Sequence, residues 1–85
     1  MSMNKLNLEE FVIFFSDQFD DTDLELFTPE LSFHDLEEWS SLVGLAVLNM
    51  ITQKYMVRVS PNELTNTLTV KDLWELVQNK VENNQ

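Results

Sequence analysis

Several residue types are scarce in this chain, which has no cysteine, one glycine, one histidine and two prolines. The absence of cysteine excludes disulfides, zinc sites built from thiolates and a cysteine nucleophile. A single histidine leaves no second imidazole for a usual zinc site, and a single glycine cannot form a glycine-rich loop that cradles phosphates. No acid and base are clearly paired, so we do not expect the chain to be an enzyme by itself.

Basic residues are also few: five lysines and arginines stand against fifteen aspartates and glutamates, giving a formal charge of −10. This charge repels nucleic acid and anionic membranes, and it favours a partner with a basic docking surface unless it serves only to keep the protein soluble. No stretch approaches the length of a membrane span, and residues 1–5 contain no apolar signal core. We therefore expect a soluble, cytoplasmic monomer without membrane insertion or nucleic-acid binding.

The chain has 85 residues, which predicts one domain with a core over about residues 6–80 and a polar tail at 81–85. A chain of this size buries about 60–65% of its unfolded surface, so the core is expected to be small. Neither an internal repeat nor a low-complexity segment divides it.

A first helix is predicted from Asn7 to Phe19. Asn7 is a good N-cap, and Glu10, three residues later, can complete a capping box. Apolar residues recur at helical spacing along this segment and predict one buried face: Leu8, Phe11, Val12, Phe15 and Phe19.

A long loop is predicted from Asp20 to Trp39, because residues 20–23 are acidic and turn-rich and Pro29 discourages a continuing helix. A loop of this length needs anchors in a compact domain. Six apolar residues can pin it against the helices: Leu24, Leu26, Phe27, Leu31, Phe33 and Leu36. A short helical turn around Pro29–Phe33 fits the pattern.

Three further helices follow. The second should begin at Ser40 or Ser41, with Ser40 as the N-cap, and end near Tyr55; it is apolar over more than one face. A short third helix begins at Ser60, and a fourth opens at residues 69–72, before a frayed tail over residues 80–85. Residues 56–59 alternate like a strand but have no obvious partner. The prediction is an all-α bundle of three longer helices and one short one.

The transition into the second helix carries the most informative motif. Trp39-Ser40-Ser41-Leu42, followed by an apolar helix, resembles the attachment site of acyl carrier and peptidyl carrier proteins, whose usual pattern is Asp-Ser-Leu. The resemblance extends over about residues 6–80. It implies the carrier-protein fold, a four-helix bundle with a long loop between its first two helices.

The resemblance also implies a function. Ser41 would carry a 4'-phosphopantetheine arm, transferred from coenzyme A by a phosphopantetheinyl transferase. The arm would hold acyl or aminoacyl groups as thioesters for fatty acid, polyketide or other specialised biosynthesis. The implied partners include acyl-loading and acyl-transfer enzymes, such as an acyl ligase or a ketosynthase.

This chain departs from the family pattern at two places. Ser40 stands where the family has aspartate; its hydroxyl can cap the helix but brings no charge, which Glu37 and Glu38 supply nearby. Related carriers often have glutamates along the second helix, whereas here the outer positions include Ala46 and Thr52. We therefore expect a more apolar partner surface, formed by the following residues: Trp39, Leu42, Val43, Val47, Glu37 and Glu38.

Other interpretations of the motifs are weaker. The acidic run that starts at Asp21 has Leu26 and Ser32 where a calcium-binding EF-hand needs glycine and glutamate. His34 is interpreted as a solvated or capping residue, and Gly44 as relief for close packing or as room for the arm. The main alternative function is a helical interaction module that keeps the carrier fold without receiving an arm.

Overall fold

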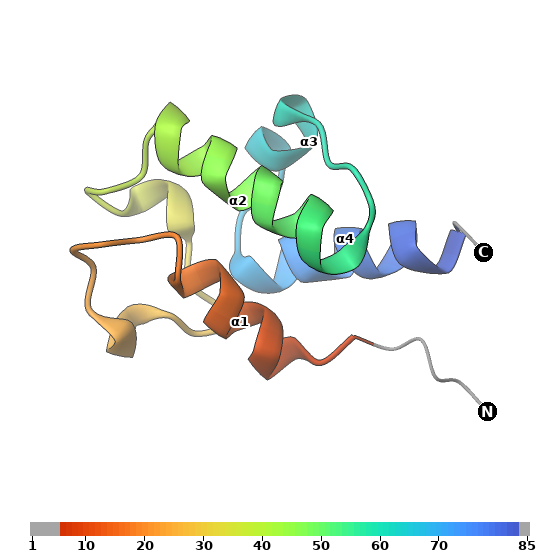
Figure 1. Cartoon of the computed structure of the whole chain (residues 1–85). Helices are drawn as coiled ribbons and strands as arrows, with labels where there is room; N and C mark the ends of the chain where they lie inside the picture. Colours follow the sequence, from red (N-terminus) through yellow and green to blue (C-terminus); the bar gives the residue numbers. More distant parts are fainter. Residues whose placement is uncertain (1–5, 84–85) are drawn as a thin grey trace.

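The structure is a computed structural model that describes residues 6–83 (Figure 1). It has four α-helices and two short 3-10 helices: α1 (Leu8–Ser16), η1 (Leu24–Leu26), η2 (Phe33–Asp35), α2 (Ser41–Tyr55), α3 (Pro61–Asn66) and α4 (Val70–Asn83). The all-α prediction, with three longer helices and one short one, is confirmed for these residues. The described chain contains no strand, so residues 56–59 do not form one; its single isolated bridge joins Ser32 to Thr69.

The helix starts follow the predicted caps. Asn7 Oδ1 accepts a hydrogen bond from the Glu10 N–H at 2.9 Å. Ser60 and Glu63 form a complete capping box at the start of α3, with bonds of 3.1 and 2.9 Å. Each cap joins residues three positions apart, so the local sequence is sufficient to specify it.

Two helix ends differ from prediction. α1 ends at Ser16 rather than Phe19, although the Phe19 side chain is still buried in the core. α4 continues to Asn83, so the predicted frayed tail is wrong for residues 80–83. Lys80 in this turn forms a partly exposed ion pair with Glu63 at 3.0 Å, and Val81 packs against the core. Residues 84–85 lie outside the described part of the chain.

One core unites the helices and the loop. α2 packs against α1, α3 and α4, and α1 packs against α4. The largest fully buried side chains come from α1, η2, α2 and α4: Phe11, Phe15, Phe33, Val47, Ile51, Val70, Leu73 and Val77. The Phe33 ring lies 5.3 Å from the Phe15 ring, so an aromatic side chain of the loop completes the helical core.

The long loop is anchored at only some of the predicted positions. Phe27 and Phe33 are buried, and Leu31 and Leu36 pack against the core. By contrast, Leu24 and Leu26 in η1 are 73% and 50% exposed, so the prediction that they pin the loop is wrong. The predicted turn is also displaced, because the helical turns of the loop lie at η1 and η2.

The second half of the loop is hydrogen-bonded to the first residues of α4. The Val70 N–H donates to the carbonyl of Leu31 at 3.1 Å, and the Lys71 N–H donates to the carbonyl of Pro29 at 2.8 Å. These main-chain bonds explain how a long connection without extended secondary structure keeps a fixed path to the start of α2.

Candidate functional site

Ser41 is the first residue of α2, the green helix in Figure 1, and its side chain is exposed. The preceding Ser40 is the N-cap: its Oγ accepts a hydrogen bond from the Val43 N–H at 3.2 Å, and its carbonyl accepts one from the Gly44 N–H at 2.8 Å. Within the described residues, no hydrogen bond engages the Ser41 hydroxyl. The two adjacent serines therefore have different roles. The Ser40 hydroxyl caps the N-terminus of α2, whereas the Ser41 hydroxyl is exposed there and has no hydrogen-bond partner within the described residues.

Trp39 fixes the direction from which the chain enters α2. Its ring centroid lies 4.9 Å from that of Phe33, 5.4 Å from that of His34 and 6.2 Å from that of Phe19. These contacts join the segment after α1, η2 and the residues that lead into α2. Trp39 is thus a packing anchor that sets where Ser40 and Ser41 lie.

A groove of about 500 Å³ opens beside Ser41, between α2 and α3. Its lining is mainly apolar and comes from η2, the start of α2 and α3: His34, Trp39, Ser40, Ser41, Gly44, Leu45, Leu48, Pro61, Leu64 and Thr65. A hydroxyl and an apolar hollow of small-molecule size therefore occupy the same end of α2.

Gly44 lies at the floor of this groove. A Cβ at this position would lie 3.5 Å from Leu64 Cδ2 and 3.6 Å from Trp39 Cζ2, both ordinary contact distances. A methyl group would therefore fit at this position, and the glycine leaves a methyl-sized space between Trp39 and Leu64. Relief of close packing, one interpretation of Gly44 made from the sequence, is therefore not what requires a glycine here, and room for an arm stays a prediction.

His34 joins the loop to the far side of the groove. Its Nε2 lies 2.9 Å from the carbonyl oxygen of Thr67, the C-cap residue of α3, and a protonated Nε2 donates to that oxygen. The ring also packs 4.4 Å from the Phe33 ring. This fits the capping role predicted for the histidine. The described residues contain no group of three or more side chains placed to hold a metal ion.

The residues of the predicted apolar partner surface differ in their exposure. Leu42 is 77% exposed next to Ser41, while Val43 is half-buried against the core. Val47 is fully buried, so a partner docked on this face would not reach its side chain, and its predicted role is corrected. Leu45, at 56% exposure, was missed as a site residue. Its position three residues after Leu42 is the helical spacing that could have identified it.

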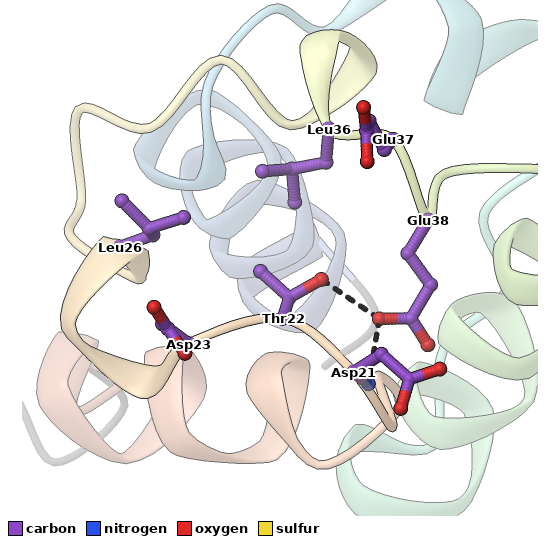
Figure 2. A pocket seen from close by; sticks show the side chains of 7 residues that line it. All are labelled: Asp21, Thr22, Asp23, Leu26, Leu36, Glu37 and Glu38. Atoms are coloured by element: carbon purple, nitrogen blue, oxygen red, sulfur yellow. Dashed lines mark hydrogen bonds between the residues drawn. The ribbon is translucent and has the colours of Figure 1, made fainter.

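The two glutamates before the site have different surroundings. Both line a second hollow, of about 550 Å³, between the start of the loop and the approach to α2 (Figure 2). Glu38 accepts hydrogen bonds from the Asp20 N–H at 2.6 Å, the Asp21 N–H at 3.0 Å and the Thr22 hydroxyl at 2.7 Å. Glu37 is exposed. The Glu38 carboxylate thus binds three donors of its own chain, and its predicted contact with a partner stays a prediction.

The hydrogen bonds to Glu38 favour its charged form. The N–H of Asp20 and the hydroxyl of Thr22 contribute most to lowering the pKa of the Glu38 carboxyl below its ordinary value of 4.5. The group therefore remains an acceptor for all three donors at neutral pH.

The chain matches no protein-family model, no curated protein and no solved structure. Among residues 6–83, no helix is both long enough and apolar enough to cross a membrane. The geometry at Ser41 and the groove therefore carries the functional argument.

Proposed function

We propose that the protein is an acyl or aminoacyl carrier whose Ser41 bears a 4'-phosphopantetheine arm. The observation that carries this proposal is an exposed, unengaged hydroxyl on the first residue of a 15-residue helix, beside an apolar groove of about 500 Å³. The resemblance of the Trp39–Leu42 motif to carrier attachment sites agrees with that arrangement.

The start of α2 fits the phosphate of such an arm. Ser40 satisfies the N–H groups of Val43 and Gly44, whereas those of Ser41 and Leu42 have no partner within the described residues. Free N–H groups and the positive end of the helix dipole stabilise an anion at this position. The donor set therefore suits a phosphodiester on the Ser41 oxygen.

Attachment requires little of the protein except a well-placed hydroxyl. The Ser41 Oγ would form a bond to the phosphorus of the pantetheine half of coenzyme A, the bridging P–O bond of the pyrophosphate would break, adenosine 3',5'-bisphosphate would leave, and the hydroxyl proton would pass to a base of the transferase. The arm, once bound, supplies the thiol that this cysteine-free chain lacks and holds cargo as a thioester. Trp39 and the Ser40 cap keep the hydroxyl in position.

The groove and the exposed leucines suggest distinct roles along α2. Leu45, Leu48 and Leu64 line the groove and can shelter an apolar part of the cargo from water. Leu42 lies outside that lining and is free to contact the transferase, an acyl ligase or a ketosynthase. Fatty acid, polyketide or other specialised biosynthesis would use these contacts, and Glu37 adds negative charge near them.

The test is intact-protein mass spectrometry after incubation with coenzyme A, magnesium and a promiscuous phosphopantetheinyl transferase. We expect one arm-sized mass gain in the native sequence and in Ser40→Ala, and none in Ser41→Ala. Ser40→Ala is the matched control, since it removes a neighbouring hydroxyl at the cost of a helix cap, about 1 kcal/mol. Circular dichroism verifies that both variants are folded. Loading that survives in Ser41→Ala would contradict the assignment.

A second candidate is an interaction module without an arm, favoured by the exposed Leu42 and Leu45 and by the serine at position 40. In that case α2 would bind a partner through its apolar residues alone. Such a module would remain unmodified in its native cell and would still bind its partner as Ser41→Ala.

A further inference from the structure

Glu38 closes a contact between two ends of the long loop. Its three hydrogen-bond donors, at residues 20–22, lie 16 to 18 positions earlier in the chain, just after α1. Figure 2 shows its carboxylate turned toward Asp21 and Thr22, which also line the second hollow. We refer to Glu38 and its three donors as the clasp.

The clasp directly precedes Trp39 and Ser40, which lead the chain into α2. Trp39, the next residue, packs on Phe19 from the end of α1, and Ser40 then caps α2. Segments after α1 and before α2 are thus joined by a polar contact at Glu38 and an aromatic contact at Trp39. A shift at Glu38 would pass along the backbone to Ser41, only three residues away.

All partners of Glu38 in the clasp are donors, which explains why the position needs a carboxylate. Two are main-chain N–H groups and the third is a hydroxyl, and both carboxylate oxygens are used. An amide side chain has one acceptor oxygen, and its NH₂ group would face a donor. Glu37 lines the same hollow but takes part in no hydrogen bond within the described residues, so it is a matched control.

We propose that Glu38 is a positioning residue for the attachment reaction: through the clasp it holds the Trp39–Ser40 segment so that the Ser41 hydroxyl meets the transferase in a reactive position. This role rests on the proposed carrier function. It assigns Glu38 to the geometry of the nucleophile and leaves Glu37 as the acidic residue available to a partner.

The test compares the loading kinetics of the native sequence, Glu38→Gln and Glu37→Gln, with the carrier as the varied substrate. A misplaced nucleophile lowers kcat, whereas a lost docking contact raises KM. We expect Glu38→Gln to lower kcat by about tenfold with little change in KM, since displacements of about 1 Å can cost about 10²-fold. Glu37→Gln should keep the native kcat.

A second variant examines the clasp from its other end. Thr22→Val removes one donor without changing charge or touching the segment that carries Ser41. It should lower kcat by less than Glu38→Gln does, and the double variant should lose less than the product of the two single effects, because both act on one contact. Amide hydrogen exchange at Asp20 and Asp21 should accelerate in Glu38→Gln and remain native in Glu37→Gln.

The outcomes separate this role from the carrier function. Loading of the native sequence with an unchanged kcat in Glu38→Gln, or with an effect on KM alone, overturns the positioning role only. Independent, multiplicative effects of Thr22→Val and Glu38→Gln also overturn it. A native sequence that accepts no arm overturns the proposed function, and the role of Glu38 fails with it.

Discussion

Gly44→Ala should stabilise the protein, an unusual result for a change at a buried helical position. Gly44 has no positive φ, so alanine fits the backbone. The added methyl would contact Leu64 and Trp39 at 3.5–3.8 Å without a clash. Replacing glycine by alanine inside a helix gains about 0.8–1.0 kcal/mol, which corresponds to a rise in Tm of roughly 4–8 °C for a domain of this size.

Thermal unfolding followed by circular dichroism measures this effect. Ala46→Gly, at a half-buried position two residues along α2, is the matched control and should lower Tm by a similar amount. Arm loading of Gly44→Ala should stay native, because Ser41 and its cap are untouched. A lower Tm for Gly44→Ala would refute the reasoning, since it would mean that Trp39 and Leu64 leave no room for a methyl group.

Three further changes test other parts of the structure. Phe33→Ala, which empties a fully buried aromatic site, should cost about 3–5 kcal/mol in urea unfolding; a loss below about 1 kcal/mol would contradict its place in the core. Leu42→Asp should change stability by no more than about 0.5 kcal/mol yet impair loading or partner binding, whereas a large loss of Tm would mean that Leu42 is buried. Burial, with the nearby negative charge of Glu10, raises the pKa of Tyr55 to about 12. Ultraviolet titration should therefore place phenolate formation near that value. The stability due to the neutral phenol is complete below pH 10 and is lost as pH rises from 10 to 12; a midpoint near 10 in the folded protein would contradict this.

Helix starts could be predicted from the sequence, whereas two helix ends could not. Asn7, Ser40 and Ser60 bond to N–H groups three residues away, so each cap is a local property of the chain. The last turns of α4 instead make contacts with distant parts of the chain, since Lys80 pairs with Glu63 of α3 and Val81 packs against the core. The polar sequence of residues 80–83 predicted a frayed tail, because a local sequence pattern does not show contacts with distant residues.

The difference between local and distant contacts also explains which site residues could be predicted from the sequence. Ser41 and Leu42 could be identified because a capped helix start has a short signature. Val47 was misassigned because α2 is apolar on most sides, so its periodicity does not show which residues face the core. The clasp at Glu38 could not be foreseen, since its donors are separated from it by most of the loop.

The carrier function is tested most directly by the mass of the protein isolated from its native cell, with tandem fragmentation to locate any modification. A carrier will have a 4'-phosphopantetheine-sized gain on Ser41, and the gain will be absent from Ser41→Ala expressed in the same cell. A native protein that carries no arm, or carries one on Ser40, would contradict the assignment.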